Sequence, residues 1–193
     1  MEDMLQQEQL LIDAVNILLA EINENPIEDA EDFEFILEAK KAKMTLIEAK
    51  RAVLSEGWDF NTDKNWIFPI DVNGMIPIPM NVLDVTSTRP DVIMRNWRLY
   101  SKKDQSHIFE EEVPCKVIWD ADFNSLSHPL RHYITLRAVN LFVARQTGDT
   151  NVYGANSKDM EDAVLAARRS ETRTSQYNML SGTYGINNRV RIN

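Results

Sequence analysis

Two histidines four residues apart are the first place where this sequence could support chemistry. His128 and His132 would share one face of a helix, and two imidazoles on one face bind a metal ion when further ligands approach. The nearest acids are Asp120 and Asp122, in the segment before the pair. Capping or surface positions explain both histidines without a metal, so we expect no metal site.

Carboxylates are the second candidate, because a glycoside hydrolase needs a pair of them at the scissile bond. The chain has 30 Asp and Glu residues, so such a pair is compatible with the sequence, but a solvated acidic face explains the same residues. The sequence contains no glycine-rich phosphate loop, no Gly-x-Ser-x-Gly elbow and no His-Glu-x-x-His. The one cysteine, Cys115, lies in an apolar run that favours a buried, inert thiol. We therefore predict no catalytic residue and no cofactor.

Arginine and aromatic residues are interleaved between Arg95 and Tyr100. This pattern can form a platform for a sugar or a nucleic acid, and it also fits a strand with one packed face and one wet face. A net charge of −9 and a pI near 4.9 argue against broad binding to a nucleic-acid backbone. The same acidity suits a surface along which DNA slides without adhering.

Length and composition indicate an ordinary folded protein. A chain of 193 residues, 44% apolar and 26% charged, buries a full core and is most simply one domain. No apolar run approaches the roughly 20 residues that span a bilayer. The acidic N-terminus has neither the basic start nor the apolar core of a secretion signal.

The charge is distributed unevenly along the chain. Residues 1–39 hold twelve Asp and Glu and no Lys or Arg, whereas five arginines from Arg168 onward face only Glu171. A chain with one acidic and one basic end can be complementary to further copies of itself, arranged head to tail. Solvated surface at both ends explains the same charges and is the usual case for a lone domain.

Helical periodicity appears at both ends of the chain. We expect a helix over about 7–23 and a long one over about 31–56, ended by Gly57. The long helix should bury one apolar stripe, with Trp58 and Phe60 plugging its end. The stripe contains Phe35, Ala39, Ala42, Leu46, Ala49 and Val53, widened by Leu37, Met44, Ile47 and Leu54.

A third helix should run from about Leu130 to Thr147, with Ser127 as N-cap, Pro129 in its first turn and Gly148 at its end. It is apolar nearly all round, with Tyr133 and Phe142 in the core. A last helix should cover about 157–176, and residues 178–193 should form a flexible tail that orders on contact with a partner.

The middle of the chain reads as short strands. We expect them over 66–72, 75–88, 92–100 and 113–119, with a two-residue hairpin turn at Asn73-Gly74. The predicted fold is therefore α+β: an antiparallel bundle built from the N- and C-terminal helices, and a β-rich block of short antiparallel strands. Within a single domain 1–193, the helical lobe would be 7–62 and 125–177, and the β-rich lobe 63–122.

Several segments together resemble the tail tubular protein A family, the adaptor or gatekeeper in the head-to-tail connector of short-tailed bacteriophages. The resemblance covers about residues 10–170 in order and spacing. It rests on Ala14-Val15-Asn16-x-Leu18, Gly57-Trp58-Asp59-Phe60-Asn61-Thr62, Ile76-Pro77-x-Pro79-x-Asn81-x-Leu83-x-Val85, Leu99-Tyr100, Asp122-Phe123, Leu126-x-x-Pro129-x-Arg131-x-Tyr133-Ile134 and Arg145-x-x-Gly148. The acidic first 39 residues and the short basic tail are not part of the pattern.

The resemblance implies a non-enzymatic virion protein of the tail or neck, assembled in the host cytoplasm. Its partners would be sister copies in a twelve-membered ring, a portal protein and a tail tubular protein B-like nozzle protein, with double-stranded DNA passing through and no membrane contact. The ring would complete the DNA channel, retain the genome and then release it.

Residues for these contacts follow as hypotheses. Towards sister copies or the portal we expect Arg168, Arg169, Arg173, Tyr184, Ile186, Arg189 and Arg191. Towards the nozzle we expect Lys102, Lys103, Asp104 and His107, in the loop 101–107. Two other functions stay open, a tail-associated polysaccharide hydrolase using a carboxylate pair and a regulatory DNA-binding helical protein, although the acidic helices argue against the second.

Overall fold

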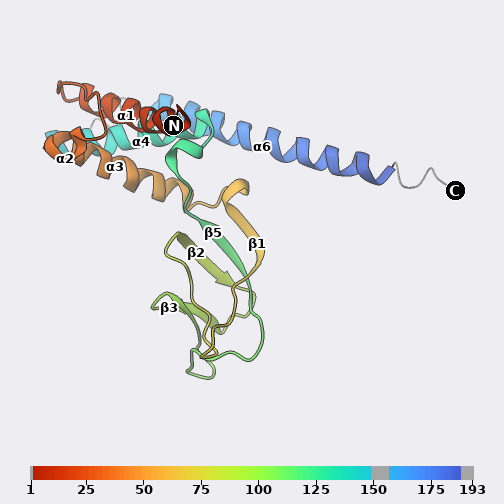
Figure 1. Cartoon of the computed structure of the whole chain (residues 1–193). Coiled ribbons are helices and arrows are strands. Elements are labelled where there is room, and N and C mark those ends of the chain that lie inside the picture. Colours follow the sequence, from red (N-terminus) through yellow and green to blue (C-terminus); the bar gives the residue numbers. More distant parts are fainter. Residues whose placement is uncertain (1, 149–156, 188–193) are drawn as a thin grey trace. The chain divides into compact units, whose positions relative to one another are not determined.

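A computed structural model describes residues 2–148 and 157–187 of the chain, with the side chains of 9–148 and 158–173 (Figure 1). The chain forms two compact units. The helical unit comprises Met1–Lys50 and Asp122–Asn193, and the β unit comprises Arg51–Ala121. Helices at both ends and antiparallel strands between them confirm the predicted α+β class.

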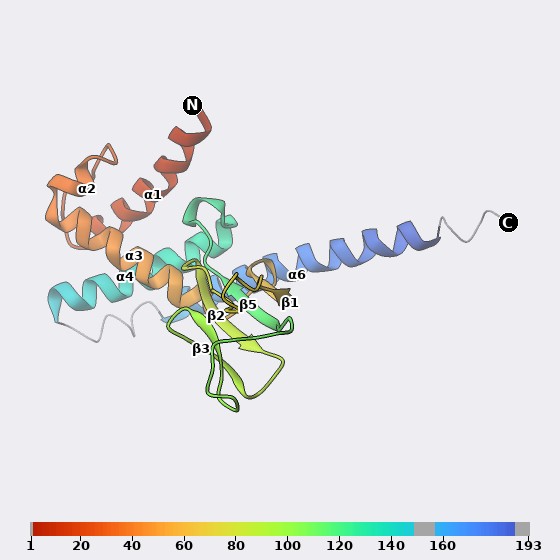
Figure 2. The same cartoon turned by 60° about the horizontal axis from the view of Figure 1, so that its bottom comes forward.

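The helical unit is organised around α4 (His128–Thr147), which contacts α1 (Glu2–Ala20) and α6 (Ser157–Asn187). Helix α3 (Leu37–Leu54) runs beside α4 in both views (Figures 1 and 2), and Arg145 joins them by two hydrogen bonds of 2.7 and 2.8 Å to Glu48. A short 3-10 helix, η2 (Phe123–Ser125), contacts α1.

Helix α4 starts and ends as its sequence predicts. Ser127 has the extended backbone of an N-cap residue and Pro129 lies in the first turn, where its missing N–H has no helical partner to lose. Gly148 ends the helix at φ +69°, and its N–H donates to the carbonyl of Ala144 at 3.0 Å. Tyr133 and Phe142 are 6% and 2% exposed. Buried side chains on most sides of α4 make it the centre of this unit.

The β unit contains two small antiparallel sheets. In the first, the strand order is β1 (Thr62–Ile67), β5 (Pro114–Trp119), β2 (Val82–Ser87). In the second, β3 (Val92–Arg95) pairs with β4 (Arg98–Ser101). The core between them consists of Phe68, Ile76, Ile78, Val82, Val92, Leu99, Phe109, Val113, Cys115 and Val117.

The segment after α3 is held by one buried asparagine. Gly57 adopts φ +77° and a short 3-10 helix, η1 (Asp59–Asn61), follows. The side-chain amide of Asn61 donates to the carbonyls of Leu54 (3.1 Å) and Trp119 (2.8 Å), and its oxygen accepts from the N–H of Trp58 (2.9 Å). Trp58 is 1% exposed and donates to the carbonyl of Val53, but Phe60, expected beside it in the core, is 54% exposed. The single 3-10 turn directs Phe60 outward, away from the face that Trp58 and Asn61 share.

The predicted long helix is interrupted at Ile36, whose backbone is extended (φ −101°, ψ 111°) between α2 (Asp32–Phe35) and α3. In one continuous helix, Phe33 would point almost opposite to Ala39 and Ala42, at 100° per residue. The break lets Phe33 reach the core, where it is 2% exposed. Phe35, two residues further on, is exposed as a consequence. Leu37, Met44 and Ile47 are also exposed, because they lie on the side of α3 away from the buried stripe. All four were predicted to be buried.

Other boundaries also differ from the prediction. Helix α1 begins at Glu2 and ends at Ala20. The first strand is 62–67 rather than 66–72, because its pairing with β5 ends at Ile67, just before Pro69. The predicted strand 92–100 is a hairpin, with Asn96 and Trp97 at φ +54° and +57°, as in a type I′ turn.

The Asn73-Gly74 turn is present with a three-residue loop: Gly74 donates to Asp71 at 3.0 Å, and Asp71 donates to Met75 at 2.7 Å. At the C-terminus, α6 continues to Asn187 instead of ending near Gln176. Residues 188–193 of the expected tail lie outside the described residues.

Candidate interaction surfaces

The predicted basic surface lies on α6. Its inner face buries Ala163 and Ala167 at 4% and 2% exposure, and α6 contacts α4. Arg168, Arg169 and Arg173 are exposed. Arg168 has a 3.8 Å ion pair with Glu171 on its own helix, a surface pair that contributes little. The three arginines therefore face solvent, where an acidic partner can reach them.

The remaining residues of this set extend beyond the described side chains. Tyr184 and Ile186 belong to the backbone of α6, but their side chains lie outside the described part of the chain. Arg189 and Arg191 lie outside the described residues altogether. Their contacts stay predictions.

The loop 101–107 is internally fixed rather than free. Ser101 is buried, its hydroxyl donates to Asp104 at 2.7 Å, and the N–H of Asp104 donates back to that hydroxyl at 3.1 Å. His107 is held by Nδ1, 2.9 Å from the carbonyl of Leu99, and its ring lies edge-on to Tyr100. Lys102 and Lys103 are exposed between them. The structure thus brings the predicted group together and leaves the two lysines as its outward charges.

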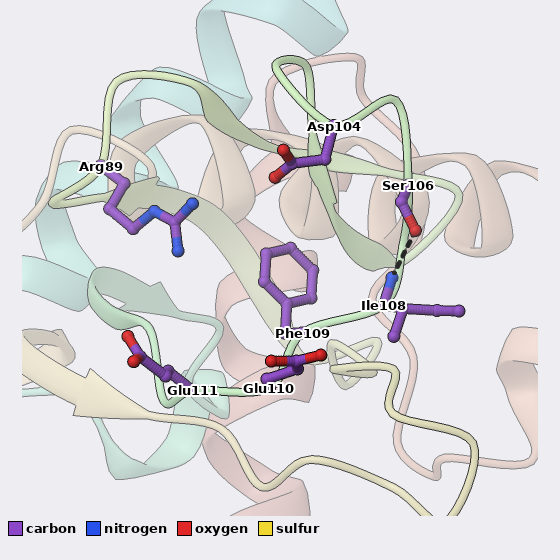
Figure 3. Close-up of a pocket in the computed structure, with 7 residues that line it drawn as sticks. All are labelled: Arg89, Asp104, Ser106, Ile108, Phe109, Glu110 and Glu111. Atoms are coloured by element: carbon purple, nitrogen blue, oxygen red, sulfur yellow. Dashed lines mark hydrogen bonds between the residues drawn. The ribbon is translucent and has the colours of Figure 1, made fainter.

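A cavity of about 420 Å³ opens beside this loop (Figure 3). Its walls carry Arg89 and three carboxylates around the ring of Phe109, and Ser106 accepts a hydrogen bond from the N–H of Ile108 at 3.0 Å. The lining is Arg89, Asp104, Ser106, Ile108, Phe109, Glu110 and Glu111. Sequence reasoning missed this cavity, because its lining comes from two loops that only the fold brings together.

Glu48 and Asp91 have lowered pKa values, whereas a catalytic acid needs a raised one. Two hydrogen bonds from Arg145 hold the pKa of Glu48 below its usual value. At Asp91 burial acts to raise the pKa, but the hydrogen bond from Arg89 and further hydrogen bonds outweigh it, so the pKa is lowered. A glycosidase acid needs a raised pKa, so neither group supports a hydrolase.

The two histidines lie together without a metal site around them. The rings of His128 and His132 stack at 6.5 Å between centroids, with an interplanar angle of 12°. Within residues 2–148 and 157–187, no group of three or more His, Cys, Asp or Glu could hold a metal ion. Both histidine side chains are exposed at the start of α4.

Large exposed apolar side chains are the feature that sequence reasoning did not find. In the β unit, Val72, Met80, Trp97 and Ile108 are exposed. In the helical unit, Phe35, Leu37 and Met44 on α2 and α3 are 82%, 58% and 64% exposed. The helical spacing of Phe35, Leu37 and Met44 can be read from the sequence, but it led to the prediction that these residues are in the core.

A comparison with protein families identifies the family of this chain. No helix in the described part of the chain is long and apolar enough to cross a membrane. No curated protein matches the sequence. The family model described as "tail tubular protein" matches residues 12–177, which confirms the resemblance. The chain therefore belongs to the tail tubular protein family and is a structural protein of a bacteriophage tail.

Proposed function

We propose that this protein is the ring-forming adaptor between the portal and the nozzle of a short-tailed phage. Twelve copies would close around the DNA channel, docking on a portal protein above and on a tail tubular protein B-like nozzle protein below. The ring would help to hold the packaged genome and release it at ejection. The proposed role is non-enzymatic and places the protein in the neck of the virion.

The observation that carries this proposal is the family match over residues 12–177, which spans both units. Two further features support it. Helix α6 has 31 residues and would be about 46 Å long at 1.5 Å per residue, and it presents exposed arginines to a partner. The net charge of −9 suits a tunnel through which DNA passes without being captured.

Each of the two surfaces has a proposed role. The arginines of α6, with Tyr184, Ile186 and the basic residues after Asn187, would meet sister copies or the portal. Lys102 and Lys103 would face the nozzle, presented by the fixed Ser101–His107 loop.

Electron microscopy of the protein mixed with its portal tests the proposal. The expected result is a twelve-fold ring attached to one face of the portal, absent when the portal is omitted or replaced by bovine serum albumin. Images in which the portal remains bare at saturating protein concentration would refute it. Heads filled with DNA should also lose their genome sooner when the protein is withheld.

A further inference from the structure

The outward face of α3 carries three large apolar side chains, although it is opposite to the face that packs into the core. Lys40 and Arg51 are exposed in the same sector. At 100° per residue, Leu37, Met44 and Ile47 lie within a sector of about 80°. The buried positions lie on the other side of the helix. Phe35 and Ile36 continue the apolar surface directly before α3. The exposed fractions are 82% for Phe35, 40% for Ile36, 58% for Leu37, 64% for Met44 and 36% for Ile47. We call these five residues the α3 patch.

The α3 patch is as large as the largest apolar patch on a typical monomer. Taking about 200 Å² for a fully exposed large apolar side chain, the five residues leave on the order of 500 Å² open. Monomeric proteins rarely expose contiguous apolar patches larger than about 300–600 Å², and patches of that size are often functional. A standard interface buries about 800 Å² per partner, so the patch would form the centre of one.

The charge around the patch changes sign along α3. Residues 21–38 contain eight Asp and Glu and no Lys or Arg, whereas residues 39–51 contain five Lys and Arg and one Glu. Lys40 lies 3.2 Å from Glu34, Lys41 lies 3.8 Å from Glu38, and Lys43 lies over the ring of Phe33 at 4.3 Å. A partner that fits the acidic start of this surface therefore offers an apolar side chain next to positive charge.

The same chain carries an exposed apolar residue followed by arginines on α6. Leu165 is 50% exposed although it lies on a helix whose inner face is occupied by alanines. Arg168 and Arg169 follow one turn later on the same side, and Arg173 one turn after Arg169. We call Leu165, Arg168, Arg169 and Arg173 the α6 face. Two exposed acids, Glu161 and Asp162, lie one turn before Leu165, so the charge changes sign along α6 as it does along α3. The three cations of the α6 face complement the acidic start of the α3 patch.

We propose that the α3 patch of one copy binds the α6 face of the next copy. This inference rests on the proposed ring and names the contact that closes it. The two surfaces lie on different helices of the helical unit, so the contact joins unlike patches. Such a contact continues from copy to copy and closes into a ring when the rotation between neighbours divides a full turn, whereas a contact between like patches ends at a dimer.

The apolar half of the contact is tested with a matched pair of methionines. Met44→Asp places a charge in the α3 patch, and Met80→Asp places the same charge at a methionine of the β unit that is 81% exposed. Rings on the portal are counted by electron microscopy at one protein concentration. Met44→Asp should reduce ring formation at least tenfold, while Met80→Asp should match the wild type. Thermal melts of both variants check that they fold.

The charged half is tested by exchanging signs between the surfaces. Variant one carries Glu34→Lys and Glu38→Lys, and variant two carries Arg169→Glu and Arg173→Glu. Each variant alone should form few rings, because every contact then joins like charges. An equimolar mixture should restore rings, since alternating copies make every contact attractive. One chain with all four substitutions should also recover.

The outcomes separate this inference from the proposed function. A wild-type protein that forms no ring on the portal contradicts the proposed function itself. Wild-type rings accompanied by normal rings of Met44→Asp, or by no rescue in the mixture, overturn only the contact between α3 and α6. Intact rings that detach from the portal in variant two would show that the α6 face binds the portal instead, which also overturns it.

Discussion

Asn61 should matter more to the β unit than the larger residue beside it. The change we consider is Asn61→Ala, with Phe60→Ala as the matched control one position earlier. Asn61 is 3% exposed and makes three hydrogen bonds to main-chain groups, whereas Phe60 is 54% exposed. Phe60→Ala removes more atoms, but Asn61→Ala removes three hydrogen bonds. The N–H of Trp58 and the carbonyl of Trp119 lose their bond to the side chain of Asn61, whereas the carbonyl of Leu54 still accepts from the N–H of Gly57 at 3.1 Å.

The expected loss of stability in Asn61→Ala follows from the hydrogen bonds that the substitution removes. A buried donor or acceptor left unsatisfied costs about 1–3 kcal/mol. Taking about 1.5 kcal/mol for each of the two groups left without this bond, because water reaches part of the opened site, Asn61→Ala should destabilise the β unit by about 3 kcal/mol. At about 4–8 °C per kcal/mol for a unit of this size, the melting temperature falls by at least about 10 °C. Phe60→Ala should remain within about 1 kcal/mol of the wild type, because the lost side chain is more than half exposed.

Tryptophan fluorescence makes the measurement specific to the β unit. All four tryptophans, Trp58, Trp66, Trp97 and Trp119, belong to Arg51–Ala121. Far-UV circular dichroism at 222 nm reports mainly the helical unit. Thermal and urea unfolding followed by both signals therefore assigns each loss of stability to a unit, with the wild type measured in the same buffer.

A third variant separates hydrogen bonding from packing. Asn61→Asp keeps the shape and the oxygen that faces Trp58, but at neutral pH it replaces the donor to Leu54 and Trp119 with an acceptor. It should be at least as unstable as Asn61→Ala at pH 7 and recover partly in acid, when the carboxyl group donates again. The reasoning is wrong if Phe60→Ala destabilises the fluorescence transition as much as Asn61→Ala does.

Three further predictions concern single contacts. Gly57→Ala should destabilise the β unit by about 1–2 kcal/mol, because Gly57 has φ +77° and an added Cβ would lie 3.1 Å from Cδ1 of Ile118. Urea unfolding followed by tryptophan fluorescence measures this loss, and an unchanged midpoint would contradict the prediction. Glu48→Gln should destabilise the helical unit by at most about 1 kcal/mol at pH 7, since the pair with Arg145 is half exposed. Because the folded-state pKa of Glu48 is lowered, its contribution is present above the unfolded-state pKa and lost as the pH falls through the folded-state pKa; urea unfolding at 222 nm should show equal stability of variant and wild type in strong acid. Cys115 is fully buried, which raises the pKa of its thiol, so it should react with Ellman's reagent only after unfolding.

Local signals predicted the regular parts of the fold well. The N-cap segment, Pro129 and Gly148 define α4 because each acts through the backbone geometry of its own position. The alternation of apolar residues placed the last strand within one residue of β5. The family segments lie along the same elements, so the order of these elements is readable in the amino-acid sequence alone.

The positions that could not be predicted depend on distant partners. Phe33 is buried only because the helix breaks at Ile36, and no local signal marks that break. Asn61 looks like an ordinary turn residue until β5 brings the carbonyl of Trp119 to it. The cavity beside the 101–107 loop has the same origin, since Arg89 and Glu111 lie on separate segments of the chain.

The wrong burial predictions on α2 and α3 are all of one kind: an apolar residue predicted to be buried is exposed. Phe35, Leu37, Met44 and Ile47 were expected inside and are outside. Helical periodicity reports that a side chain is apolar, and it does not report which molecule covers it. An apolar stripe on the outward face of a helix marks a candidate interaction surface. If sister copies cover α3 in the tail, these residues have the burial that their sequence indicates. Substituting them should then leave the melting temperature of the free protein nearly unchanged while abolishing assembly, the reverse of what Asn61→Ala should do.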